Sequence, residues 1–208
     1  ELLLSAIDPF VLGNKGSALI HEMLHNLGAR FNGRPCHIPA ALDRNGTVVH
    51  ALLSGTYAGG SMDEVMARDY LAGRYWGAMD SNEEGFWNFE TMNLKGEQKD
   101  CAVYLSFWLF SPRSLVNLLL EPNMPRLDLE FAADDKLAVY VNGNLLDNAV
   151  KRQDNPALPQ RIEGIPLEKG WNHVLLKVGQ LWGGWNGRFR FIATDPAYMR
   201  QLESVIMQ

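Results

Sequence analysis

Short apolar runs, separated by turn-forming segments, follow one another along the chain from about residue 48 to residue 195. They read TVVHALLSGTY, DCAVYLSFWLF, RLDLEFAA, KLAVYVNGNLL, NHVLLKVGQ and GRFRFIAT. In RLDLEF and NHVLLKV the apolar and polar residues alternate, as in a strand with one face in a core. Asn142-Gly143 between two apolar runs predicts a tight hairpin turn. Because no alternation of strands with helical segments appears, the sequence predicts a mainly β fold, an antiparallel β-sandwich.

Helical patterns occur outside these runs. Residues 17–30 carry apolar residues at helical spacing after a glycine-containing loop. MDEVMARDYLA, residues 62–72, predicts a short helix over one end of the sandwich, and residues 196–208 show helical spacing again. We therefore expect a helical extension over residues 1–47, the sandwich over residues 48–195 and a C-terminal helix over residues 196–208.

Composition limits the partners and the compartment. Of the 208 residues, 47% are hydrophobic and 21% are charged, which is typical of a globular chain. The net charge of −5 and the absence of a basic stripe argue against a nucleic-acid partner. No apolar run is long enough to span a membrane, and ELLLSAIDPF lacks the features of a signal peptide as it stands. Cys36 and Cys101 form either one disulfide or two buried thiols.

Four segments in order resemble one family of domains. They are DYLAGRYWGAMDSNEEGFWNFETM, CAVYLSFWLFSPRSL, PRLDLEFAADDKLAVYVNGNLL and IPLEKGWNHVLLKVGQLWGGWNGRFRFI. Together they resemble bacterial galactose-binding-like β-sandwich domains of the jelly-roll type, which are often appended to secreted polysaccharide-degrading or surface proteins. The resemblance covers about residues 48–194. It implies a non-catalytic accessory module in an extracytoplasmic location, with a glycan or polysaccharide as its ligand.

Sugar binding needs aromatic faces for the apolar patches of the ring, and polar groups for the hydroxyls. GQLWGGWNGR places two tryptophans among four glycines, a composition that is hard to explain by core packing alone. The alternative is that a tryptophan closes the end of the sandwich while the glycines allow bulges. The candidate ligand-binding residues are Trp76, Trp87, Asn142, Asn144, Trp182 and Trp185.

The residue types allow two candidate metal sites, and the first is a pair of aspartates. Asp134 and Asp135 are oxygen donors of the kind that calcium prefers. The alternative is that they cap a hairpin by bonding backbone amides. Lys136 stands where the resembled family usually has glycine, and we therefore favour the capping role.

HEMLH, within residues 17–30, has the His-Glu-x-x-His pattern of zinc peptidases. His21 and His25 would share one helical face as zinc ligands, and Glu22 would activate the metal-bound water. A metzincin-like site wants a third histidine at position 31, which is Phe31 here. The stretch is therefore the tail of a peptidase domain, an inactive relic, or a surface helix without metal.

Three classes of function follow from these observations. The leading hypothesis is a non-catalytic carbohydrate-binding or accessory module of an extracytoplasmic bacterial protein. The second is a zinc-dependent metallopeptidase, or the C-terminal part of one, that uses the HEMLH helix. The third is a structural or assembly subunit that contacts other protein chains or upstream domains.

Overall fold

The computed structural model describes residues 30–31, 34–35, 40–68, 76–91, 99–116, 124–146, 151–153 and 159–206. The predicted helix over residues 17–30 lies outside this set except for Arg30, which belongs to β1 (Arg30–Phe31) and pairs with β2 (Arg34–Pro35). His21, Glu22 and His25 lie outside it as well. Their predicted role in zinc binding and catalysis therefore stays a prediction.

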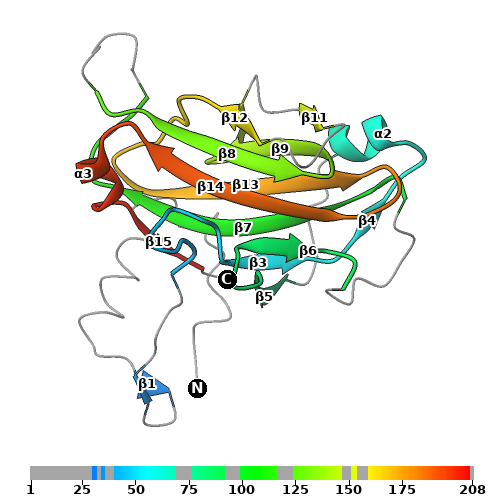
Figure 1. The fold of residues 1–208 in the computed structure, drawn as a ribbon, viewed down its shortest axis with the longest axis horizontal. Helices are drawn as coiled ribbons and strands as arrows, with labels where there is room; N and C mark the ends of the chain where they lie inside the picture. Colours follow the sequence, from blue (N-terminus) through cyan, green and yellow to red (C-terminus); the bar gives the residue numbers. More distant parts are fainter. Residues whose placement is uncertain are drawn as a thin grey trace.

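Two antiparallel sheets pack face to face as a sandwich, which confirms the predicted mainly β fold (Figure 1). The main path of the larger sheet consists of β10 (Asn144–Leu145), β9 (Asp135–Val141), β13 (Gly170–Gln180), β7 (Cys101–Ser111), β3 (His50–Ser54) and β5 (Trp76–Asp80). Joined to it are β4 (Tyr57–Ala58), β11 (Lys151–Gln153) and β15 (Glu203–Val205). The smaller sheet has the order β12 (Gln160–Ile162), β8 (Leu127–Ala133), β14 (Asn186–Ala193) and β6 (Phe86–Asn88).

The core lies between the sheets and follows from the alternation along the strands. In β7, Val103, Leu105 and Phe107 belong to the main core, whereas Tyr104 packs in a separate cluster with Tyr57 and Leu175. Phe107 meets Phe191 of the smaller sheet edge to face, with ring centroids 6.0 Å apart. Full burial of one such side chain stabilises the fold by about 1.5–3 kcal/mol.

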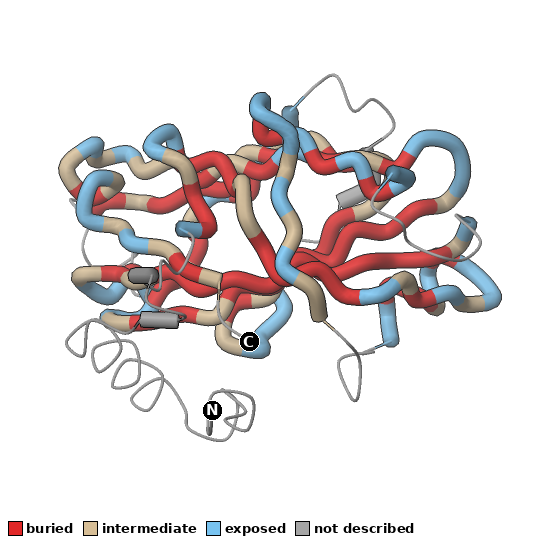
Figure 2. The backbone as a smooth tube through the Cα atoms, turned by 90° about the horizontal axis from the view of Figure 1, so that it is seen from below, coloured by how far each residue is buried: buried red, intermediate tan, exposed pale blue. Residues whose placement is uncertain are grey.

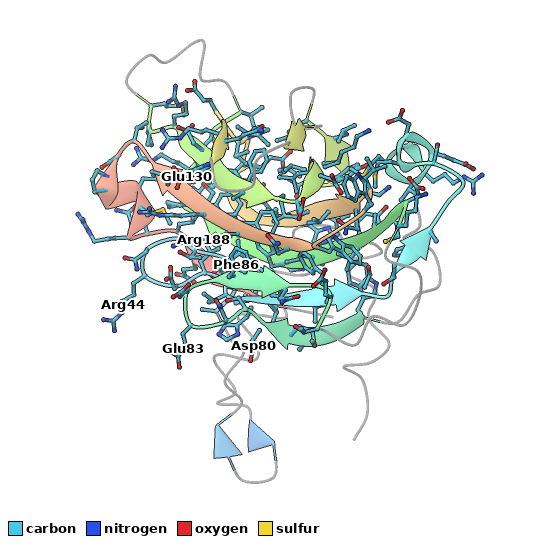
Figure 3. The ribbon with its side chains drawn as sticks, turned by 45° about the vertical axis from the view of Figure 1, so that its right-hand side comes forward. Arg44, Asp80, Glu83, Phe86, Glu130 and Arg188 are labelled. Carbon is cyan, nitrogen blue, oxygen red and sulfur yellow. The ribbon has the colours of Figure 1, made fainter. Side chains whose placement is uncertain are left out.

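The outer faces of the two sheets differ. Phe86 and Arg188 pair across neighbouring strands of the smaller sheet, and Figure 3 shows them near Glu130 on its exposed side. On the larger sheet the outward-facing Trp108 and Trp171 are almost completely buried, in a cluster that includes Val205 of β15. One sheet therefore presents charged side chains to solvent, and the other has an apolar outer layer.

Two short helices complete the described part. The α2 helix (Met62–Ala67) begins at Ser61, whose hydroxyl accepts a hydrogen bond from the backbone N–H of Glu64. The α3 helix (Pro196–Met199) begins at the capping residue Asp195. It is shorter than the C-terminal helix predicted for residues 196–208, because the chain instead forms β15. This strand pairs with β7 at residues 108–110, beyond the residues that pair with β3.

The antiparallel pairing of β9 with β13 defines two ends of the sandwich. Lys136 pairs with Gly179 near one end, and Val141 pairs with Val174 toward the other. We call these the Asp135 end and the Asn142 end. Buried residues run along the long strands, and exposed residues concentrate in the connecting turns (Figure 2). Within the described residues, no helix is long and apolar enough to cross a membrane.

Candidate binding site at the Asp135 end

A cavity of about 270 Å³ lies at the Asp135 end. Its walls come from the start of α2, the residue before β7, the corner between β8 and β9, and the loop after β13. The lining residues are Ser61, Met62, Asp63, Asp100, Asp135, Lys136 and Leu181. The strand pairing brings these segments together, although they are far apart in the sequence.

Asp100 and Asp135 both hold a left-handed backbone conformation in the cavity wall, with φ of 48° and 65°. Aspartate tolerates this conformation better than most residues, but it still carries strain. One oxygen of the Asp135 carboxylate accepts hydrogen bonds from the backbone N–H groups of Leu181 at 2.5 Å and Trp182 at 3.4 Å. These bonds offset the strain and tie the β8–β9 corner to the loop after β13. Asp135 thus bonds backbone amides, as in the alternative to calcium binding, but these amides belong to the loop after β13 and not to its own hairpin.

Trp182 follows Leu181, which lines this cavity. It has 72% of its surface exposed, the highest value among the large apolar side chains of the described residues. A second bond holds its loop, since the side-chain amide of Gln180 donates to the carbonyl of Gly183 at 2.8 Å. Gly183 has φ of 90°, a conformation that favours glycine. The glycines around Trp182 therefore shape a turn that presents the indole to solvent.

The cavity is rich in carboxylates and contains one lysine. Lys136 forms a hydrogen-bonded ion pair with Asp63, which lowers the pKa of that carboxyl. Nearby, Asp134 lies under Gly184, and its pKa is raised by burial and by the charges of Asp135 and Glu90. No group of three metal-ligating acids, histidines or cysteines occurs within the described residues. Calcium binding by Asp134 and Asp135 stays a prediction.

Trp87 and Trp185 lie in the core, contrary to their proposed role as ligand contacts. Both are fully buried, so neither ring offers a face to a ligand in this structure. The Trp87 indole N–H donates to the carbonyl of Val48 at 2.9 Å, and the Trp185 ring lies 5.4 Å from that of Phe89. Of the two tryptophans in GQLWGGWNGR, one closes the sandwich and the other is exposed, because the loop reverses between them.

Trp76 lies outside the Trp182 site. It belongs to β5 at the edge of the larger sheet, and its ring centroid is 6.3 Å from that of Tyr104 on the outer face. Trp76 is partly buried in this aromatic cluster. The structure therefore gives it a packing role on the outer layer.

Asn142 and Asn144 lie at the opposite end of the sandwich from Trp182. β9 has seven residues, so about 20 Å separates the two ends of this strand. Asn142 has φ of 51° in the predicted hairpin turn, and its amide donates to Asn172 and accepts from the backbone of His173, both at 2.9 Å. Asn144 donates to the Asn142 carbonyl at 3.4 Å. The pair shapes the turn and cannot share a small ligand with Trp182.

The sequence did not single out Asp63, Asp100 or Lys136 as site residues, although they line the cavity. For Asp63 the sequence contains a usable indication, because this residue belongs to the helix that residues 62–72 predict over one end of the sandwich. Asp100 has no such indication, since its left-handed conformation depends on the neighbouring strands. Cys101, the residue after Asp100, is a free thiol and is buried, so the second of the two cysteine alternatives holds for Cys101. Burial raises the pKa of this thiol to about 11.

Comparison with known proteins gives structural similarities only. No protein-family model matches the sequence, and no curated protein matches it either. An anti-sigma factor domain-containing protein is similar over 70% of this chain and 43% of its own, at 14% identity and a TM-score of 0.43. A beta-glucosidase from Kluyveromyces marxianus, in complex with glucose, is similar over 88% and 22%, at 13% identity and a TM-score of 0.44.

A third structure is the epithelial adhesin 9 A domain from Candida glabrata in complex with Galb1-4GlcNAc. It is similar over 81% of this chain and 96% of its own, at 12% identity and a TM-score of 0.39. The chain spans less than half of the length of the first two proteins. At these identities and TM-scores, none of the three establishes a family or a function for this chain.

Proposed function

We propose that this chain is a non-catalytic carbohydrate-binding module and that Trp182 is its principal ligand contact. The observation that carries the proposal is an indole with 72% of its surface exposed, on a residue whose backbone N–H bonds to Asp135 and whose neighbour Leu181 lines the cavity. Exposed apolar surface of this size has a cost in water, and a sugar ring stacked on the indole removes it. Such an arrangement suits a ligand with an apolar face and polar edges.

The cavity provides the polar half of this recognition. Asp63 and Asp100 offer carboxylate oxygens that accept hydrogen bonds from hydroxyls, and the ammonium of Lys136 donates them. Ser61 can do either. Met62 and Leu181 add apolar surface between these groups. The combination resembles the usual lining of small-molecule sites, in which a few polar groups fix the orientation of the ligand.

The location of the protein is part of this proposal. A module that binds polysaccharide meets its ligand outside the cytoplasm, as an accessory part of a secreted, periplasmic or surface protein. Glycan is then the partner that the Asp135 end recognises. Contacts with other chains or upstream domains use the remaining surface.

Affinity electrophoresis through gels that contain galactan, xylan or mannan tests the proposal, with a glycan array to extend the panel. We expect at least one glycan to retard the wild-type chain, and Trp182→Ala to abolish the retardation. Leu145→Ala is the matched control, because Leu145 is an exposed apolar residue at the opposite end, with 46% of its surface accessible. Absence of binding across the whole panel, or equal retardation of the two variants, would reject the proposal.

A further inference from the structure

Lys177 is completely buried on the outer side of β13, an unusual place for a lysine. Its ammonium donates hydrogen bonds to three backbone carbonyls, those of Val65 at 2.6 Å, Met66 at 3.1 Å and Arg68 at 2.6 Å. It also lies 5.2 Å from the centroid of the Tyr104 ring, within the range of a cation–π contact. The charge is thus compensated by oxygen dipoles and by an aromatic face.

The three carbonyls belong to the C-terminal end of α2 and its cap. Carbonyls at this end of a helix lack partners within the helix and carry its partial negative charge. The last turn of α2 contains no basic residue, and the guanidinium of the capping residue Arg68 pairs with Glu64 instead. Lys177 supplies the missing cation from the sheet underneath, and so fixes the C-terminal end of a helix that is six residues long.

The rest of α2 also depends on the strands below it. The sulfur atoms of Met62 and Met66 lie over Gly179, so close that a Cβ on this glycine would approach them to 2.9 and 2.8 Å. The ion pair between Lys136 and Asp63 holds the first turn. Neighbouring strands therefore hold the two ends of the helix, with Lys136 on β9 and Lys177 on β13.

The same helix provides Ser61, Met62 and Asp63 to the cavity wall. We propose that Lys177 is the positioning residue of the carbohydrate site: it seats α2 on the sheet, and this seating sets the cavity. The part that concerns ligand affinity rests on the proposed function. The seating of α2 by Lys177 stands on the hydrogen bonds alone and can be measured without ligand.

Hydrogen–deuterium exchange, read by mass spectrometry, tests the seating. Lys177→Met keeps an unbranched, apolar stem about as long as that of lysine and removes the charge and the donors. We expect backbone amides of residues 62–68 to exchange about tenfold to a hundredfold faster, as loss of charged hydrogen bonds predicts, with little change in residues 101–111 of β7. Leu176→Ala is the control, because it weakens the core from the same strand and should accelerate both segments together.

Lys177→Arg keeps the cation and should restore much of the protection of residues 62–68. If Lys177→Met does not fold, Lys177→Arg serves as the test in its place. Its backbone amides should then exchange faster than those of the wild type in α2 alone, and by less than tenfold. Parallel acceleration of β7 and α2 in Lys177→Met, or no acceleration in α2, would overturn the proposal.

Affinity electrophoresis through the same galactan, xylan and mannan gels completes the test. We expect the glycan affinity derived from the retardation to fall about tenfold or more in Lys177→Met. Lys177→Arg should restore most of this affinity. If no glycan retards the wild-type chain but α2 alone loses protection, the proposed function fails and the seating stands. If wild type and Lys177→Met bind equally while α2 loses protection, the coupling to the site is wrong.

Discussion

The carboxylate of Asp135 and the backbone of Trp182 are joined across the Asp135 end by a hydrogen bond of 3.4 Å, beside the 2.5 Å bond from Leu181 to the same oxygen. The bond connects the β8–β9 corner to the loop after β13. One residue thus holds a strained corner and fixes the backbone of the loop that carries the exposed indole. Removing this carboxylate should affect stability and ligand binding together.

Replacement of Asp135 by alanine should lower the free energy of unfolding by about 1–3 kcal/mol and weaken glycan binding. The change removes a charged acceptor of two backbone N–H groups and puts a less tolerant residue at φ of 65°. Asp135→Asn should cost less, since asparagine accepts the left-handed conformation and keeps an acceptor oxygen. Urea denaturation of both variants measures whether Asp135→Ala loses more stability than Asp135→Asn. Equal stability of wild type and Asp135→Ala would contradict this prediction.

The two tryptophans of the same loop should respond in opposite ways. Trp185 is fully buried, so Trp185→Ala should destabilise the fold by about 3–5 kcal/mol. Trp182→Ala removes an exposed side chain and should change the free energy of unfolding by less than about 0.5 kcal/mol. Thermal or denaturant unfolding of the two variants makes this comparison. A large loss of stability in Trp182→Ala would show that its ring packs on the fold rather than faces solvent.

These two residues also show how far the sequence alone can reach. The alternating strands and Asn142-Gly143 predicted the sandwich and one hairpin, because both depend on local periodicity and turn chemistry. GQLWGGWNGR left two alternatives open, a ligand-binding loop or a tryptophan that closes the sandwich, because the burial of each indole depends on where the loop reverses. The distance between Asn142 and Trp182 depends on strand pairing, which a single sequence does not reveal.

The helix over the cavity is a similar case. The spacing in residues 62–72 predicted a short helix over one end of the sandwich, and α2 spans Met62–Ala67 of that range. Its anchor, Lys177, reads in the sequence as an ordinary polar residue of an alternating strand. Only the contact between β13 and α2 shows that its ammonium is buried against carbonyls. Long-range contacts of this kind have no local signature.

His173 should make the stability of the fold depend on pH. Its imidazole shares a 2.8 Å hydrogen bond with the hydroxyl of Ser106, and burial lowers its pKa from 6.5 to about 4. Between these two values the unfolded chain binds more protons than the folded chain, so the free energy of unfolding falls as pH falls from 6.5 to 4. Above pH 6.5 and below pH 4 this contribution is constant.

The expected loss over that window is up to about 3 kcal/mol. His173→Gln keeps a polar partner for Ser106 but does not titrate, so its stability should decline less between pH 7 and pH 4. Urea denaturation at a series of pH values, with the two chains side by side, gives the difference. Parallel curves would show that His173 is protonated equally in the folded and unfolded chain.

Two glycines with nearly the same backbone should differ in their tolerance of a side chain. Gly46 has φ of 82°, and an added Cβ would lie 2.2 Å from the carbonyl oxygen of Phe191. Gly143 has φ of 80° and open space around it. Alanine is strained at both positions, but Gly46→Ala should cost about 1–3 kcal/mol more because it also forces the backbone apart. Equal losses in thermal unfolding would contradict this packing.

The most direct test of the central claim is calorimetric titration of the folded chain with the polysaccharide that retards it most strongly in the gels. If Trp182 is the ligand contact at the Asp135 end, Trp182→Ala should lower the affinity at least about tenfold, the loss expected for a stacked ring, while its unfolding curve stays that of the wild type. Leu145→Ala should bind as the wild type does. Unchanged affinity in Trp182→Ala, with both variants folded, would contradict the assignment of the binding site to this end of the sandwich.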